Sequence, residues 1–194
     1  AKITCSYFYA RINSFLDDST ILIAETGDAI CAVTDFFIQE TENFIAQAYY
    51  LSIGYGVPAT LGVSLARPEK RVLLLEGDGA FQMTVQEVST MIRQNCNPVI
   101  FILNNKGYVI ERLIHDGAYN NIQNWNYSAL PEAFGGKNTV SIKVHTENDL
   151  EDALKQVRKN KDKLIFIEVM LDPTDSSLAL AQISKKFRSL SEKE

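Results

Sequence analysis

Short apolar runs recur along the chain, separated by segments with helical spacing. The runs at 72–75 and 99–103 are bounded by turn signals and are too short for helices, so they predict buried parallel strands. The complete set of expected strands lies at residues 21–24, 44–46, 72–75, 99–103, 140–144 and 164–171.

Between these runs, apolar residues recur at three- and four-residue intervals. The helices expected from this spacing lie at residues 3–16, 47–66, 108–116, 128–134, 147–159 and 176–190. Strands that alternate with helices are typical of an α/β fold with a doubly wound, mainly parallel sheet and helices on both faces. At 194 residues, a single domain covering 1–194 is expected.

Two of the expected strands end in polar residues that suit a cation. Gly77, Asp78 and Gly79 follow the run at 72–75, and the segment 104–107, with sequence NNKG, follows the run at 99–103. The carboxyl ends of neighbouring parallel strands face one crevice. A carboxylate, amide oxygens and free carbonyls form an oxygen-only set suited to Mg²⁺ or Ca²⁺.

The same loops also suit a phosphate group. A metal with so little protein charge around it is expected to share a phosphate, and Gly77 and Gly79 allow the backbone to approach such an anion. Thr84 and Glu87 form a capping box that predicts a helix start just beyond, where backbone amides donate to phosphate.

Composition excludes several other classes of function. A formal charge of −5 argues against a nucleic-acid or anionic-membrane surface, and the basic run at 155–163 is the solvated end of an expected helix. The three cysteines have no paired-ligand spacing, which excludes a zinc site. No apolar run reaches the ~18 residues of a membrane span, and the first residues lack a signal-peptide core, so we expect a soluble cytoplasmic protein.

The spacing of these motifs resembles a known family. The GDG at 77–79, followed after 24 residues by the NN at 104–105, resembles the thiamine diphosphate-binding motif. The surrounding TVQEVSTMIR, NNKGYVIERLIHDGAYNNIQNW and AETGD resemble the C-terminal cofactor-binding domain of pyruvate decarboxylase and its 2-oxo-acid decarboxylase relatives, over residues 3–172. A lone GDG is also an ordinary turn, and only the combination at this spacing is specific.

The resemblance implies two cofactors, thiamine diphosphate and Mg²⁺, and assigns residues to each. Asp78, the side chain of Asn105 and the carbonyl of Gly107 would hold the metal. Glu111 would be the catalytic acid/base. The residues expected to contact the cofactor are Asp28, Leu51, Ser52, Ile53, Gly79, Ala80, Asn105, Lys106, Gly107, Tyr108, Val109 and Ile110.

Some of these roles have alternatives in the sequence. The Leu51 carbonyl would accept from the cofactor's 4′-amino group, and Ile53 would be a stiff wedge between its rings or ordinary core. Asp28 would approach the diphosphate or cap the following helix. Glu111 would be catalytic or a surface residue favoured by a helix dipole. Tyr50 and Leu51 stand where Trp and Gly are frequent in the family, which leaves the shape of the pocket open.

The resemblance also implies that this chain holds half of an active site. The family's pyrimidine-binding and middle domains have no counterpart here, and its site forms between two subunits of a homodimer or homotetramer. We therefore expect the isolated chain to be inactive towards its substrate, a small 2-oxo acid such as pyruvate. Alternative functions are an acetolactate synthase-like carboligase and a noncatalytic Mg²⁺- and phosphate-binding doubly wound domain.

Overall fold

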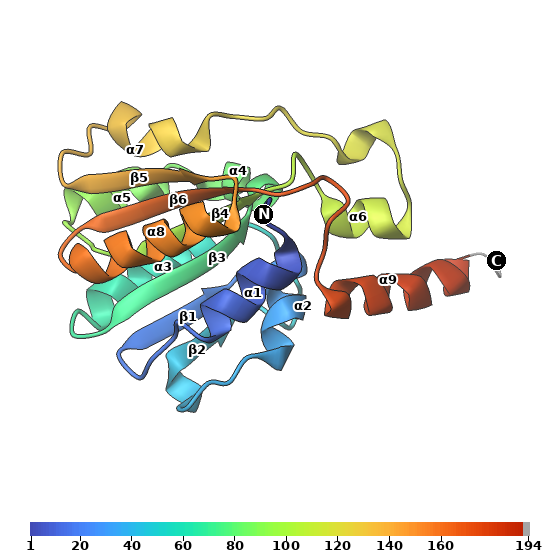
Figure 1. Ribbon diagram of the computed structural model, residues 1–194, viewed down its shortest axis with the longest axis horizontal. Helices are drawn as coiled ribbons and strands as arrows, with labels where there is room; N and C mark the ends of the chain where they lie inside the picture. Colours follow the sequence, from blue (N-terminus) through green and yellow to red (C-terminus); the bar gives the residue numbers. More distant parts are fainter. Residues whose placement is uncertain (192–194) are drawn as a thin grey trace.

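The computed structural model describes residues 1–191, and its centre is a six-stranded sheet in which every pair of neighbouring strands is parallel (Figure 1). The strand order is β2-β1-β3-β4-β6-β5. The strands are β1 Thr20–Ala24, β2 Phe44–Ala46, β3 Arg71–Gly77, β4 Val99–Asn104, β5 Thr139–Val144 and β6 Leu164–Met170. The predicted doubly wound α/β fold and its strands are confirmed.

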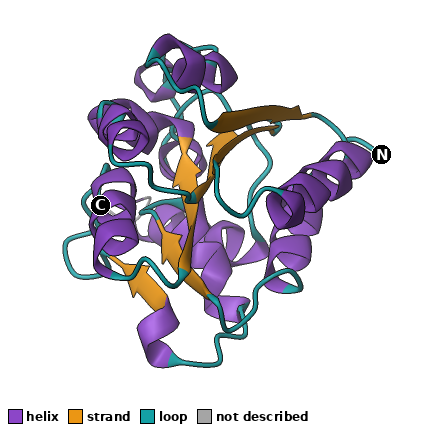
Figure 2. Cartoon of the chain, turned by 90° about the vertical axis from the view of Figure 1, so that its left-hand side faces the viewer, coloured by secondary structure: helices purple, strands orange, loops and turns teal. Residues whose placement is uncertain are grey.

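Helices cover both faces of the sheet (Figure 2). Their bounds are α1 Cys5–Asn13, α2 Asp28–Ala32, α3 Gly56–Ala66, α4 Asp78–Thr84, α5 Glu87–Arg93, α6 Val109–Ile114, α7 Leu130–Ala133, α8 Glu147–Lys159 and α9 Leu178–Ser191. Alternate strand residues enter separate cores: Leu73 packs with residues of α1 and α8, whereas Leu74 packs with residues of α3 and α5. Burial on both faces explains why the inner strands are mostly apolar.

The order of the strands fixes where a ligand can bind. The chain passes from β1 outward to β2 and then returns to the other side of β1 with β3. Loops that leave β1 and β3 in opposite directions open a crevice at the carboxyl edge of a doubly wound sheet. At this edge, α6 and α9 extend beyond the strands (Figure 1).

Two sequence predictions near this edge are wrong in detail. The helix expected at 47–66 begins only at Gly56. The preceding residues turn, because Leu51 (φ 53°) and Gly54 (φ 85°) adopt left-handed backbone conformations that a helix does not allow. The Thr84–Glu87 capping box does not form: α4 already begins at Asp78, and the Thr84 hydroxyl donates to the carbonyl of Gly54 at 3.0 Å.

The remaining helices agree with their predicted positions to within a few residues. The helix expected at 108–116 is α6, Val109–Ile114, and the last helix is α9, Leu178–Ser191. The three cysteines are free thiols. Within residues 1–191, no helix has both the length and the apolar character needed to cross a membrane.

Candidate functional site

A cavity of about 410 Å³ lies at the carboxyl edge of the sheet, where the loops after β1, β3 and β4 meet. It is enclosed by the loop before α3, the start of α4 and the start of α6. The residues that line it are Thr26, Gly27, Asp28, Ala29, Leu51, Ile53, Gly77, Gly79, Ala80, Leu103, Asn105, Gly107, Tyr108, Val109, Ile110, Glu111 and Leu171. Most of the residues expected to bind a cofactor are therefore brought together.

Three oxygen-bearing groups converge beside this cavity. One terminal atom of the Asn105 amide lies 2.6 Å from the carbonyl oxygen of Gly107 and 3.3 Å from Oδ1 of Asp78. If this atom is the amide nitrogen, it donates to both oxygens. If the amide is rotated by half a turn, the atom is the amide oxygen, and three oxygens lie close together. In the second orientation a carboxylate, an amide and a carbonyl offer oxygens to one cation, which is the ligand chemistry that Mg²⁺ prefers.

Asp78 is the only predicted metal ligand that carries a charge, and it is fully buried. Its carboxylate accepts from the amides of Gly79 at 2.9 Å and Gly107 at 3.2 Å. Burial raises the pKa of Asp78 to about 7, while backbone amides and the charge of Arg112 act in the opposite direction. A bound cation would offset this desolvation and stabilise the ionised carboxylate.

A polar network holds the second loop from the side of the sheet. Asn104 donates to Oε1 of buried Glu168 at 2.8 Å, and its own oxygen accepts from the amide of Lys106 at 3.3 Å. The other oxygen of Glu168 accepts from the amide of Ser128 at 3.0 Å and pairs with Lys143 at 3.1 Å. Of the two adjacent asparagines, Asn105 thus faces the converging oxygens, while Asn104 fixes the loop.

Leu51 and Ile53 form the outer wall of the cavity. Leu51 has a left-handed backbone, with φ of 53°, and its amide is held by the side-chain oxygen of Gln47 at 2.9 Å. A non-glycine residue in this conformation is strained and is characteristic of functional sites. The side chains of Leu51 and Ile53 are 53% and 39% exposed, so neither is ordinary core in this chain.

Gly79 and Tyr108 pack closely on the inner wall. A Cβ atom at Gly79 would lie 2.4 Å from Cε1 of Tyr108, so this position has space only for glycine while the ring stays in place. Ala80, Val109 and Ile110 continue the wall. The backbone here can approach a bound group without an intervening side chain.

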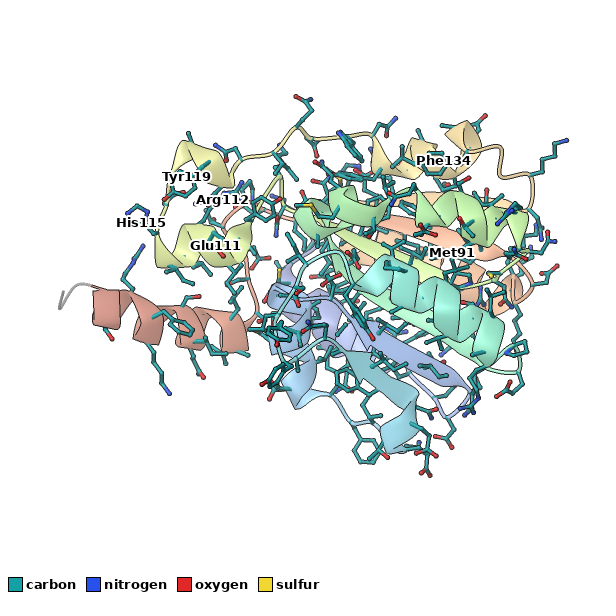
Figure 3. The ribbon with its side chains drawn as sticks, turned by 180° about the vertical axis from the view of Figure 1, so that it is seen from behind. Met91, Glu111, Arg112, His115, Tyr119 and Phe134 are labelled. Atoms are coloured by element: carbon teal, nitrogen blue, oxygen red, sulfur yellow. The ribbon has the colours of Figure 1, made fainter. Side chains whose placement is uncertain are left out.

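Glu111 lies on α6 at the cavity, with an exposed side chain (Figure 3). His115, expected one turn further along the same helix, instead has an extended backbone after the helix ends. Its ring stacks on Tyr119 with an interplanar angle of 9°, and its Nδ1 pairs with the tyrosine hydroxyl. Glu111 is therefore the acidic side chain of α6 that is available to a bound molecule.

Asp28 lines the cavity but does not cap the helix that follows it. The N-cap of α2 is Gly27, and the Asp28 carboxylate instead accepts from the amide of Ser177 at 3.1 Å. The Ser177 hydroxyl in turn accepts from the amide of Leu180 at 3.1 Å in α9. The capping alternative is thus wrong, and the carboxylate ties the cavity wall to the start of α9.

Two residues expected to bind the cofactor do not line the cavity. The Ser52 hydroxyl accepts from the Gln47 amide at 3.4 Å, and Ser52 is exposed. Lys106 lines a separate pocket together with Lys2 and His145. The backbone of Lys106 is left-handed, with φ of 64°.

Two charged features next to the site were not predicted from the sequence. Glu25 and Glu76 are buried together beneath the loop before α3, where Glu25 accepts from the amide of Gly56 at 2.7 Å. Burial and the neighbouring Glu25 raise the pKa of Glu76 well above its ordinary value. Arg112 hydrogen-bonds to the loop after β4. The buried glutamate pair had one signal in the sequence, because Glu76 is an acidic residue at the end of an apolar run.

Comparison with known proteins identifies similar sequences. Residues 25–169 match the family described as "Thiamine pyrophosphate enzyme, C-terminal TPP binding domain". The chain is 44% identical to pyruvate decarboxylase 1 of Arabidopsis thaliana over 177 residues, which are 90% of this chain and 29% of that protein. It is 36% identical to the alpha-keto-acid decarboxylase of Mycobacterium tuberculosis (strain H37Rv) over 183 residues, 93% of this chain and 33% of that protein. The chain thus spans about a third of the length of these relatives.

Proposed function

Because the chain belongs to the thiamine pyrophosphate enzymes and carries their C-terminal cofactor-binding domain, we propose that it binds the diphosphate of thiamine diphosphate through Mg²⁺ within a 2-oxo-acid decarboxylase. The similarity to enzymes named pyruvate decarboxylase and alpha-keto-acid decarboxylase supports this reaction class. The observation that carries the proposal is the convergence of Asp78, Asn105 and Gly107 beside a cavity lined by the other expected residues.

The proposed metal ligands are Asp78, the Asn105 side-chain oxygen and the Gly107 carbonyl. Within residues 1–191 there is no group of three or more His, Cys, Asp or Glu side chains that could hold a metal. A site with a single carboxylate suits Mg²⁺, which keeps water and phosphate oxygens among its ligands. The diphosphate would lie against the backbone of Gly79, Ala80 and residues 108–110.

Thiamine diphosphate supplies an electron sink for the decarboxylation of a 2-oxo acid when it is bound. This chain's residues would anchor and orient it. Leu51, whose backbone is left-handed, would offer its carbonyl as an acceptor, and the β-branched Ile53 would offer a stiff apolar support. Glu111 would accept or donate a proton at the reacting carbon, because its carboxyl lies at the cavity without a fixed partner on its own helix.

We further propose that a separate pyrimidine-binding domain, from another subunit of a homodimer or homotetramer, covers the outer wall. The loop that carries the cavity-lining Leu51 has a run of exposed apolar side chains: Tyr49 is 87% exposed, Tyr50 80% and Leu51 53%. Such a group is expected where an interface forms. The isolated chain would then bind cofactor weakly and release no CO₂ from pyruvate.

Calorimetric titration of thiamine diphosphate into the full-length protein, with and without Mg²⁺, tests the proposed binding. Asp78→Asn should abolish Mg²⁺-dependent binding. Asp172→Asn removes an exposed carboxylate and should leave binding intact. Equal, Mg²⁺-independent affinity in all three proteins would exclude the metal site, and no binding to the wild type would favour a noncatalytic phosphate-binding domain.

Product analysis tests the reaction and the role of Glu111. With pyruvate, the full-length protein should release CO₂ and acetaldehyde, whereas acetolactate would identify a carboligase. Glu111→Gln should lower turnover by about 10²–10⁴-fold, the usual contribution of general acid–base catalysis, while cofactor affinity stays close to the wild-type value. Normal turnover in this variant would remove Glu111 from the mechanism.

A further inference from the structure

The side chain of Arg112 connects three loops at the edge of the sheet. Figure 3 shows it between α6 and the segment that carries Tyr119, with Glu111 beside it on the helix. Its guanidinium donates to neutral oxygens of the loops after β4, α6 and β6. These acceptors are the carbonyls of Asn105 (3.2 Å), Lys106 (2.6 Å), Asn120 (3.4 Å) and Pro173 (3.2 Å) and the side-chain oxygen of Asn121 (3.0 Å).

The loop that Arg112 binds has an unfavourable backbone conformation. Lys106 has φ of 64°, and Gly107 has φ of 142°. A left-handed conformation at a lysine costs about 1–2 kcal/mol and persists only where surrounding contacts enforce it. The space around Gly107 is also filled, since a Cβ there would lie 2.1 Å from the carbonyl oxygen of Asn120 and 2.5 Å from Nη2 of Arg112.

Arg112 is half-buried, and the acceptors of its guanidinium are neutral oxygens. Among the ion pairs of the part of the chain that the structure describes, none involves Arg112. Its planar fork of donors instead holds divergent carbonyl oxygens together. Lysine has one donor atom and cannot reproduce this geometry.

We propose that Arg112 is a positioning residue, which holds the backbone of residues 105–107 in the conformation that presents Asn105 and Gly107 to the cation. The inference rests on the proposed metal site. Arg112 bonds the carbonyls of Asn105 and Lys106 from the helix side, and Asn104 bonds the amide of Lys106 from the sheet side. The loop is thus fixed before any cation arrives, which removes the conformational cost of binding.

The chain contains a matched control at the opposite edge of the sheet. Arg71 is also half-buried, and it donates to the carbonyls of Asn97 (3.1 Å), Val157 (2.8 Å), Asn160 (3.0 Å) and Lys163 (3.1 Å). Arg71→Met therefore removes a similar set of bonds at the start of β3, away from the cavity. It reports what the loss of such a network does to stability alone.

Hydrogen exchange in the full-length protein without cofactor or metal is the first measurement. Arg112→Met should increase amide exchange in a peptide covering residues 105–108 at least about tenfold, with Arg71→Met unchanged there. Arg112→Lys keeps the charge and the aliphatic stem, so it should fold and yet exchange as fast as Arg112→Met. Wild-type exchange at this loop in Arg112→Lys would overturn the proposal.

The second measurement is the Mg²⁺ concentration that half-saturates binding of thiamine diphosphate, followed by calorimetry. Residues that support metal ligands typically contribute 10–100-fold in metal affinity, so Arg112→Met should raise this concentration at least about tenfold. Arg71→Met should lower thermal stability but leave the half-saturating Mg²⁺ concentration unchanged. In an Arg112→Ala variant, free guanidinium at millimolar concentration should partly restore the wild-type Mg²⁺ requirement. An unchanged Mg²⁺ requirement in Arg112→Met would refute the proposal.

The two measurements separate this inference from the proposed function. If the wild-type protein bound no thiamine diphosphate at any Mg²⁺ concentration, the proposed function would fail. Hydrogen exchange would then still decide whether Arg112 holds the loop.

Discussion

Replacing Gly79 with alanine tests the close packing of the cavity wall. An added Cβ would lie 2.4 Å from Cε1, 2.9 Å from Cδ1 and 3.1 Å from Cζ of Tyr108. The ring must therefore move by roughly 1 Å to reach ordinary contact distance. Overpacking of this kind typically costs about 1–3 kcal/mol.

The same substitution at Gly62 provides the control. A Cβ at Gly62, inside α3, would meet no atom within 4 Å, so Gly62→Ala should gain about 0.8–1.0 kcal/mol of helix stability. A change of 1 kcal/mol shifts Tm by about 2–4 °C in a protein of this size. Thermal unfolding should therefore show Gly79→Ala below the wild type and Gly62→Ala above it.

A second substitution isolates the clash itself. In a Tyr108→Leu background the ring is absent, so Gly79→Ala should lose most of its destabilising effect. Because Gly79 and Tyr108 both line the cavity, Gly79→Ala should also weaken thiamine diphosphate binding. If Gly79→Ala stabilised the protein as much as Gly62→Ala does, the close contact with Tyr108 would not exist in solution.

Three further outcomes are expected. Arg71→Met should lower the free energy of unfolding in urea by about 2–4 kcal/mol, since hydrogen bonds from a charged group are stronger than neutral ones. Arg67→Met, which removes an exposed ion pair, should change the free energy of unfolding by less than about 0.5 kcal/mol. Burial and Glu25 raise the pKa of Glu76. The contribution of Glu76 to stability is therefore complete below the unfolded-state pKa of 4.5 and is lost as pH rises through the folded-state value. Urea titrations at a series of pH values should show a flatter decline for Glu76→Gln than for the wild type. Removal of Mg²⁺ by a chelator should release thiamine diphosphate while the far-UV circular dichroism of the protein persists, and retention of cofactor on gel filtration would contradict the metal site.

The sheet could be predicted because its strands are buried on both faces. Short, continuous apolar runs such as 72–75, bounded by turn residues, are typical of strands inside a parallel sheet, and the polar residues that follow them had to gather at one edge. β3 extends slightly further than its apolar run, since Arg71 and Glu76 also belong to it. The resemblance to a cofactor family supplied residue roles that periodicity could not.

The errors arise where contacts remote in sequence decide local structure. The segment before α3 contains helix-compatible residues, but the Thr84 hydroxyl bonds the carbonyl of Gly54, 30 residues away. Asp28 had a nearby helix to cap and instead bonds Ser177, which is 149 residues later. No local pattern encodes such pairs, because they exist only after the sheet has formed.

The place of β6 in the sheet has a consequence for synthesis of the protein. Its residues, Leu164–Met170, leave the ribosome after all the remaining strands of the sheet. They nevertheless pair with β4 on one side and β5 on the other. Until residues 164–170 have been translated, the nascent chain therefore lacks an inner strand of the sheet, and β5 has no neighbouring strand to pair with. Truncation before residue 164 would divide the sheet rather than trim its edge, so its assembly is a late, cooperative event.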